Sequence, residues 1–303
     1  MDVSIIIVNY KTKQLTLDCL ASVYEQTQGL QFEVFVSDNG SLDGSVEAIR
    51  EKFPQVRLIE NNANLGFGAA NNRALAQATG KYVFYLNSDT LLLNNAVKYF
   101  FDYWESVKNK NEIGALGCVL LDSEKNPTHS GDELPTYDKI CAVQKQFLKG
   151  HIKWSMCKLL HLQNLALRLW NRVKQAPKQQ LTAGKIGYVT GADLFLMNND
   201  YARFDENFFL YYEETDLQNR LVKAGKTNYL IDGPSIIHKE KRREKNFSIT
   251  TFSVVQAQRS ALYYAKKNLQ TKIGRLKFLT LLDWLNPFEY KLTKPFLKEL
   301  KSF

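Results

Sequence analysis

The sequence predicts an α/β protein: a mixed, mostly parallel β-sheet flanked by helices, followed by a C-terminal helical extension. Apolar strand-like runs alternate with segments of helical periodicity over the first 108 residues, which is typical of a parallel sheet with crossover helices. Residues 82–86, Y-V-F-Y-L, are apolar throughout and run directly into Asn87, Ser88 and Asp89. A strand that is apolar on both faces belongs inside a sheet that is covered on both sides.

The predicted elements follow one another at short intervals. Strands are expected at residues 3–8, 32–36, 56–60, 82–86, 113–121, 186–189, 191–197, 229–231 and 235–237. Helices are expected at residues 13–27, 43–52, 67–78, 95–108, 139–175 and 213–224, and in the Lys- and aromatic-rich segment after residue 245. Leu17, Leu20 and Tyr24 give the first helix an apolar face. Gly80 and Gly225 follow two of the helices, because glycine disfavours a helix interior.

The length and composition suit one large domain with an appendage. We expect an α/β domain over residues 1–240, with a basic helical insertion at about 139–178, and a basic helical extension over 241–303. No apolar run approaches the ~18 residues that span a bilayer, and Met1 leads directly into a strand rather than a signal peptide. The four cysteines lack metal-site or disulfide spacing. These features predict a cytoplasmic protein with buried thiols.

The net charge of +9 is unevenly distributed. Residues 139–185 hold ten Lys or Arg and no Asp or Glu, which leaves −1 for the rest of the chain. Such polarisation indicates an anionic partner, unless the segment is an ordinary solvated helical face. In residues 145–174 and 272–298, basic residues alternate with apolar ones as in helices at a membrane interface. An anionic membrane surface is therefore a candidate partner, and packing on the rest of the protein or on a second subunit is the alternative. We expect no nucleic acid, since no binding module is visible, and predict no oligomeric state.

Polar side chains follow three of the predicted strands: Asn9-Tyr10, Asp38-Asn39 and Asn87-Ser88-Asp89. The carboxyl ends of parallel strands lie at one edge of a sheet, where ligands bind, so these groups should converge. A carboxylate such as Asp38 can accept a hydrogen bond from the imide of uracil or thymine. One such as Asp89 can hold a divalent cation that binds pyrophosphate, or it can simply cap a loop.

The helix that follows Asn64-Leu65-Gly66 offers backbone donors at its N-terminus. The G-F-G at residues 66–68 lacks the third glycine of a dinucleotide-binding fold. We therefore favour a site for ribose or phosphate oxygens over a dinucleotide site.

Six segments occur in a distinctive order: V-S-I-I-I-V-N-Y, V-S-D-N-G-S-L-D-G-S, N-L-G-F-G-A-A-N-N, Y-L-N-S-D-T, G-A-D-L-F-L-M and F-F-L-Y-Y-E-E-T-D-L-Q-N-R-L-V-K-A-G. They resemble the motifs of the family 2 inverting glycosyltransferases, and in particular bacterial rhamnosyltransferase-like members that build surface polysaccharide. The resemblance covers residues 3 to about 240. It implies a GT-A fold, a UDP- or dTDP-sugar donor, a divalent cation (Mg²⁺ or Mn²⁺), and a saccharide or lipid-linked acceptor.

By this resemblance, Asp38 matches the acid that recognises the base, and Asp89 matches the last acid of the D-x-D metal motif, whose first position is Asn87 here. His238 matches a second metal ligand, with a hydrogen-bonded structural histidine as the alternative. The donor-binding residues implied are Asn9, Tyr10, Asp38, Asn64, Gly66, Asn72, Asn87 and Ser88.

The E-E-T-D stretch matches the catalytic motif. Glu214 takes the place of the general base, one methylene longer than the usual Asp, and Glu213 orients the acceptor. Asp216 with Arg220 supports the helix, although acids in a first helical turn are ordinary. The resemblance also implies an acceptor site at Gly191, Ala192 and Asp193.

A different class of function is a non-catalytic protein that binds nucleotide sugars or docks on membranes. The joint presence of Asp38, Asp89, Glu214 and His238 favours an enzyme.

Overall fold

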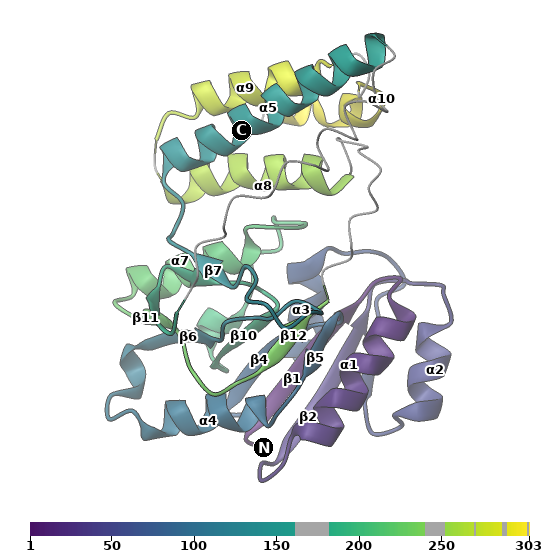
Figure 1. Ribbon diagram of the computed structural model, residues 1–303, viewed down its shortest axis with the longest axis vertical. Coiled ribbons are helices and arrows are strands. Elements are labelled where there is room, and N and C mark those ends of the chain that lie inside the picture. Colours follow the sequence, from purple (N-terminus) through teal and green to yellow (C-terminus); the bar gives the residue numbers. More distant parts are fainter. Residues whose placement is uncertain (161–181, 240–251, 270, 287–289, 302) are drawn as a thin grey trace. The chain divides into compact units, whose positions relative to one another are not determined.

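The computed structural model describes residues 1–160, 182–239, 252–269, 271–286, 290–301 and 303 (Figure 1). The chain divides into two compact units. Unit 1 comprises Met1–Leu134, Gln180–Phe209 and Glu213–Lys241, and unit 2 comprises Pro135–Gln179, Leu210–Tyr212 and Arg242–Phe303. The two basic segments that the sequence suggested as a separate insertion and extension thus belong to the same unit.

Unit 1 is built on an eight-stranded sheet with the order β3-β2-β1-β4-β10-β6-β11-β8. Its strands are β1 (Val3–Asn9), β2 (Phe32–Asp38), β3 (Arg57–Glu60), β4 (Tyr82–Asn87), β6 (Ile113–Gly117), β8 (Gly184–Ile186), β10 (Asp193–Met197) and β11 (Thr227–Leu230). The pairs β1–β2, β1–β4, β2–β3 and β6–β11 are parallel, whereas β10 is antiparallel to β4 and β6, and β8 to β11. The prediction of a mixed, mostly parallel sheet is therefore confirmed.

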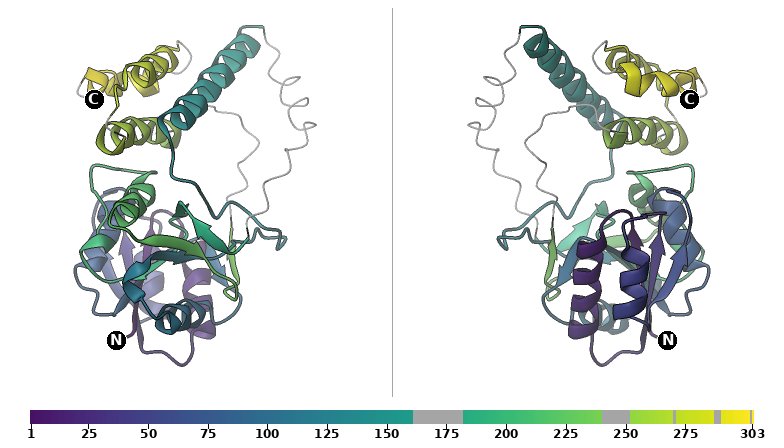
Figure 2. Two further views of the ribbon diagram at one scale, coloured as in Figure 1. Left: turned by 90° about the vertical axis from the view of Figure 1, so that its left-hand side faces the viewer. Right: turned by 90° about the vertical axis from the view of Figure 1, so that its right-hand side faces the viewer.

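Helices cover the sheet of unit 1 (Figure 2). They are α1 (Lys13–Gln26), α2 (Ser45–Lys52), α3 (Phe67–Leu75), α4 (Ala96–Ser106) and α7 (Glu213–Lys223). On α4, Phe100 and Trp104 are buried and pack against Phe195 of β10, with ring centroids 5.5 and 6.1 Å apart. Every residue from Tyr82 to Leu86 is at most 1% exposed. The apolar run at 82–86 is thus a central strand, as its composition predicted.

Two short strand pairs supplement the main sheet. β5 (Thr90–Leu92) pairs antiparallel with β12 (Ile236–His238), and β7 (Gly131–Asp132) pairs with β9 (Tyr188–Val189). The sequence predicted no strand at β5 or β7, because two or three residues are too few to show a period. The strand expected at 113–121 ends at Gly117, after which Leu121 bridges to Ile237.

The helices of unit 2 in the described residues are α5 (Tyr137–Leu159), α8 (Phe252–Asn268), α9 (Gly274–Trp284) and α10 (Tyr290–Thr293), with the 3₁₀ turns Lys294–Phe296 and Glu299–Lys301. Of the helix expected at 139–175, residues 161–175 lie outside the described part of the chain. No helix in the described residues is long and apolar enough to cross a membrane.

A buried polar network joins the helices of unit 2. The Asp283 carboxylate of α9 lies 2.5 Å from His151 Nδ1 of α5 and accepts a hydrogen bond of 2.6 Å from Gln258 Nε2 of α8. Gln258 Oε1 in turn accepts from the indole N–H of Trp284. All four side chains lie in the interior, at most 3% exposed. Polar groups buried this deeply stabilise the fold only while each keeps its partner.

We expect the substitution Asp283→Ala to lower the free energy of unfolding by about 3 kcal/mol, because it leaves His151 and Gln258 buried without their shared partner. Urea unfolding measures the change. Asp138→Ala is the matched control: the Asp138 side chain is 90% exposed and lies 3.7 Å from Arg275, so its loss should change stability by less than about 0.5 kcal/mol. Equal effects of the two substitutions would contradict the role of the network.

Candidate active site

A closed set of hydrogen bonds fixes the ends of β1 and β2. Asn9 and Asp38 lie opposite each other in the strand register, and Asp38 Oδ1 accepts from Asn9 Nδ2 at 2.6 Å and from the Ser41 hydroxyl at 2.5 Å. Asp38 Oδ2 accepts from the backbone N–H groups of Gly40 and Ser41, each at 3.0 Å. The Asn9 carboxamide oxygen accepts from Thr12 and Thr16. Asn9 is therefore fully engaged within the protein, and it positions Asp38.

The loop before α3 is tied to the same strand end. Asn39 Nδ2 donates to the Gly66 carbonyl at 3.1 Å, and the Gly66 N–H donates to Asn64 Oδ1 at 3.0 Å. Gly66 has φ +88°, and a Cβ there would lie 2.3 Å from the Phe209 carbonyl oxygen. Only glycine fits this position. Asn64 and Gly66 thus set the start of α3 close to Asp38.

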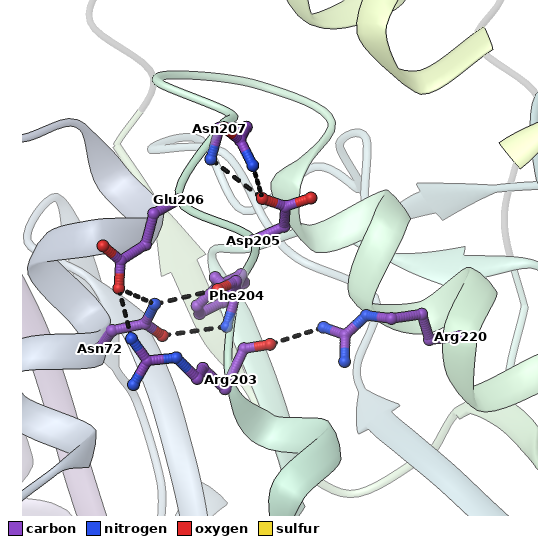
Figure 3. Close-up of polar contacts among 7 residues, drawn as sticks. All are labelled: Asn72, Arg203, Phe204, Asp205, Glu206, Asn207 and Arg220. Atoms are coloured by element: carbon purple, nitrogen blue, oxygen red, sulfur yellow. Dashed lines mark hydrogen bonds and ion pairs between the residues drawn. The ribbon is translucent and has the colours of Figure 1, made fainter. Parts of the chain in front are cut away.

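Asn72 uses its whole amide inside the protein (Figure 3). Its Oδ1 accepts from the Phe204 N–H, and its Nδ2 donates to the Phe204 carbonyl and to Glu206 Oε1, all at 2.9 Å. Glu206 also pairs with Arg203, whose carbonyl accepts a hydrogen bond from Arg220. In the structure Asn72 holds the segment before α7. To contact a nucleotide-sugar donor, as the sequence predicted, Asn72 would have to break its hydrogen bonds with Phe204.

The ribbon of β5 and β12 brings two candidate metal ligands together. Thr90 pairs with His238, so Asp89, one residue earlier, lies with Oδ1 3.2 Å from His238 Nε2. Asn87 Nδ2 lies 3.5 Å from the same nitrogen, and the Ser88 hydroxyl is 3.1 Å from that of Thr12. The side chains of Asp89 and His238 are 24% and 22% exposed, so a ligand can reach both.

This pair fits a cation that shares its coordination with a ligand. Among the described residues, no three His, Cys, Asp or Glu side chains gather into a metal-binding group. Mg²⁺ commonly binds to one or two protein carboxylates and completes its shell with water and substrate phosphates. Asp89 and His238 are the candidate residues for such an open, two-residue site.

The residues expected at the acceptor side lie on β10 and just before it. The Ala192 carbonyl accepts from the Asn87 N–H at 3.0 Å, which links this loop to the end of β4. Asp193 is 0% exposed. Its Oδ2 accepts from the Cys118 N–H at 2.7 Å, and Oδ1 has no hydrogen-bond partner among the described residues. In this conformation Asp193 offers no surface to a sugar, and burial raises the pKa of its carboxyl to about 7.

The acids of α7 lie beside that loop. Glu213 is 3% exposed, and a Cβ on Gly191 would lie 3.7 Å from the Cβ of Glu214. Burial raises the pKa of Glu214 above the ordinary value of 4.5. Asp216 is fully buried and pairs with Arg220 at 3.4 Å within α7, as a role in supporting the helix requires.

Gln218 is a further residue that positions α7, and the sequence analysis missed it. It is 0% exposed, accepts from the Val189 N–H at 2.8 Å and donates to the Val189 carbonyl at 2.7 Å. These bonds fix α7 to β9. A polar residue one turn after Glu214, next to the buried Leu217, is the signal that could have identified it.

Tyr10 differs from its neighbours in being open to solvent. Its side chain is 41% exposed, and the Lys11 ammonium lies 5.3 Å from the ring centroid. The structure therefore places an aromatic face at the rim of the site, next to the buried Asn9.

Comparison with known proteins identifies the family. Residues 4–165, more than half of the chain, match the family described as "Glycosyl transferase family 2". The chain therefore belongs to the family 2 glycosyl transferases.

Two relatives illustrate this relationship. The chain is 25% identical over 221 residues to N-acetylglucosaminyl-diphospho-decaprenol L-rhamnosyltransferase of Mycobacterium tuberculosis. This match covers 68% of this chain and 66% of the relative. It is 32% identical over 265 residues to the uncharacterized glycosyltransferase YfnE of Bacillus subtilis. That match covers 79% of this chain and 65% of the relative. The matches thus span just under two thirds of these relatives' length.

Solved structures share the fold. The mannosyltransferase PcManGT from Pyrobaculum calidifontis, in complex with GDP-Man and Mn²⁺, matches with a TM-score of 0.55 and 14% identity, over 99% of this chain and 75% of that one. S. aureus TarS 1–349 in complex with UDP-GlcNAc matches with a TM-score of 0.52 and 13% identity, over 98% and 75%. The GT-A fold expected from the sequence is confirmed.

The raised pKa of Asp193 predicts a pH-dependent stability. Between the unfolded pKa near 3.8 and the folded pKa near 7, the folded protein binds the additional proton. Its contribution to stability is complete below pH 3.8 and is lost as pH rises towards 7, by about 1 kcal/mol per pH unit. Urea unfolding from pH 5 to 8 should show this decline, and Asp193→Asn, which keeps an acceptor for Cys118, should reduce it. The same slope in both proteins would contradict the assignment.

Proposed function

We propose that this protein is an inverting glycosyltransferase. It transfers a sugar from a UDP- or dTDP-sugar to a hydroxyl of a saccharide or lipid-linked acceptor in surface polysaccharide synthesis. One observation carries this proposal: Asp38, the pair of Asp89 and His238, and Glu214 all lie at or beside the carboxyl edge of one sheet. The rhamnosyltransferase relative, whose name specifies a decaprenol-linked acceptor, supports the acceptor class. The free cysteines support a reducing, cytoplasmic location.

The nucleotide is proposed to bind between Tyr10, Asp38 and the start of α3. Asp38 recognises the base by accepting from its imide N–H. Four donors already fill its carboxylate, and a carboxylate has about four acceptor positions. Base recognition therefore requires the Ser41 hydroxyl hydrogen to turn away from Oδ1, while the Ser41 oxygen stays held by Asn9 Nδ2 and the Lys11 N–H, each at 3.0 Å. Tyr10 covers the base from the solvent side.

The diphosphate is proposed to lie against Asp89, His238 and Asn87. Asp89 and His238 would hold a divalent cation there, Mg²⁺ or Mn²⁺. Such a cation, when bound, offsets the negative charge that develops on the leaving diphosphate. Asn87 places an uncharged amide beside this pair. Asp89 is therefore the one carboxylate that the three residues bring to the site.

Glu214 is proposed as the general base. It takes the proton from the acceptor hydroxyl as the acceptor oxygen attacks the anomeric carbon on the face opposite the diphosphate. The new glycosidic bond forms while the bond from the anomeric carbon to the diphosphate oxygen breaks, so the configuration inverts. A raised pKa makes Glu214 a stronger base than an ordinary glutamate. Glu213 orients the acceptor, and the small Gly191 leaves it room next to Glu214.

The alternative is a scaffold that binds nucleotide sugars without turnover. A base of raised pKa beside a small-residue loop favours catalysis. Slow hydrolysis of the donor in the presence of Mn²⁺, without any acceptor, distinguishes an enzyme from a scaffold.

We expect Asp89→Ala to abolish the Mn²⁺ dependence of nucleotide binding without unfolding the protein, because the site loses its carboxylate. Calorimetric titration of UDP and dTDP with and without Mn²⁺ measures this. Asp102→Ala is the control, since Asp102 pairs with Lys98 on the exposed face of α4 and should leave binding unchanged. Unchanged metal dependence in the Asp89 variant would refute the metal site.

We expect Glu214→Gln to reduce sugar transfer by ~10²–10⁴-fold while donor affinity persists, because glutamine keeps the shape of the side chain but accepts no proton. In the unmodified protein, the transfer rate should rise with pH through a midpoint above 4.5, as the raised pKa of Glu214 requires. Glu51→Gln on the exposed end of α2 is the control. Near-normal transfer by the Glu214 variant would move the base to Glu213 or Asp216.

A further inference from the structure

Unit 2 carries a strong positive charge that unit 1 does not share. Its sequence holds 22 Lys or Arg and 5 Asp or Glu, a net charge of +17, whereas unit 1 holds 18 and 26, a net charge of −8. The described residues of 135–160 and 252–303 are far apart in sequence but belong to this one unit, and they hold 15 Lys or Arg against 3 Asp or Glu, so positive charge is concentrated there. A region of this charge attracts an anionic partner.

The helices α5 and α9 lie side by side within this unit (Figure 1). The Leu276 N–H donates to the Tyr137 hydroxyl at 3.2 Å, near the start of both helices. Further along, His151 contacts Asp283, and Asn286 Nδ2 donates to the Ser155 hydroxyl at 2.9 Å. The contacts advance together along both helices, which therefore run in the same direction.

Both helices also expose large apolar side chains. On α5 and the residue that follows it, these are Ile152, Met156, Leu159 and Leu160, which are 51–72% exposed. On α9 and the residue that follows it, they are Phe278, Leu281, Leu282 and Leu285, which are 38–60% exposed. We call these eight residues the α5/α9 surface. Their spacing of three and four residues places each set on one helical face, and a face of this kind marks an interaction site.

Basic side chains accompany the apolar ones. Lys145, Lys149 and Lys153 recur every four residues on α5 and are exposed, and Arg275 on α9 is 52% exposed. Exposed apolar residues among lysines are the pattern of helices that lie in the plane of a membrane interface.

We propose that unit 2 binds an anionic phospholipid bilayer through the α5/α9 surface. The lysines attract the phosphate headgroups, and the apolar side chains enter the boundary between headgroups and acyl chains. A nucleic acid would use the positive charge but leave the apolar faces exposed to water. A second copy of unit 2 would cover the apolar faces but would bring two charges of +17 together. The bilayer satisfies both properties.

This inference does not depend on the transfer reaction. The protein with Glu214→Gln, which is expected to lose transfer, should bind vesicles as well as the unmodified chain. Failure of membrane binding and failure of the proposed catalysis are therefore separate results.

Flotation of the full chain with lipid vesicles tests the proposal. We expect binding to vesicles of mixed phosphatidylcholine and phosphatidylglycerol, and none to phosphatidylcholine alone. Binding should weaken at about 1 M salt, where the Debye length falls to about 3 Å. Reversing three charges (Lys145→Glu, Lys149→Glu and Lys153→Glu) should weaken binding at least about a hundredfold. The matched control reverses Lys52, Lys108 and Lys185, which are exposed residues of unit 1, and should retain most of the binding.

A second variant tests the apolar contribution. Phe278→Ser with Leu282→Ser retains every charge and alters exposed positions, so it should fold normally and still lose vesicle binding. Four results would overturn the proposal: no flotation at low salt, equal binding by the serine variant, binding to a DNA duplex in preference to vesicles, or a stable dimer that excludes vesicles. Preference for DNA would assign the charge to a nucleic-acid partner, and the dimer would assign the apolar faces to a second copy.

Discussion

The site depends on the parallel register of β1, β2 and β4. In this register Asn9 lies opposite Asp38, and Val8 lies opposite Asn87, so the loops that leave all three strands begin at one edge of the sheet. The hydrogen bond from Asn9 Nδ2 to Asp38 Oδ1 links the carboxyl ends of β1 and β2. A slip of one residue would turn every side chain to the opposite face and break the set. On β4 two buried tyrosines would lose their partners in such a slip, because the Tyr82 hydroxyl donates to Glu105 at 2.7 Å and the Tyr85 hydroxyl to the Ala202 carbonyl at 2.8 Å.

Around this edge, a neighbouring side chain or strand pair holds each group that we propose to act in the reaction. Asn9 holds Asp38, the β5–β12 ribbon holds Asp89 beside His238, and Gln218 fixes α7 to β9. Most of these supports are buried amides, which require complete hydrogen bonding to be tolerated in a core. This rigidity suits the reaction that we propose, in which a base, an anomeric carbon and a leaving group must lie in line.

Much of the fold was predictable from the sequence, because β1, β2 and β4 each hold a run of buried apolar residues and the segments between them have helical periodicity. The convergence of Asn9, Asp38 and Asn87 followed from that pattern alone. Other features depend on partners distant in sequence. β5 exists because residues 90–92 pair with residues 236–238, and Asn72 is occupied because Phe204 reaches it. Asp193 can be buried because its carboxylate accepts from the Cys118 N–H. The two basic segments belong to one unit, and no pattern within either segment predicts this.

We propose that Asp89 and His238 hold a cation where a nucleoside diphosphate binds. A crystal structure grown with UDP or dTDP and Mn²⁺, in which the anomalous signal locates the metal, tests this proposal. We expect a manganese peak bonded to the Asp89 carboxylate, His238 Nε2 and diphosphate oxygens, with the base next to Asp38. A nucleotide bound elsewhere, or a metal peak away from Asp89 and His238, would contradict it.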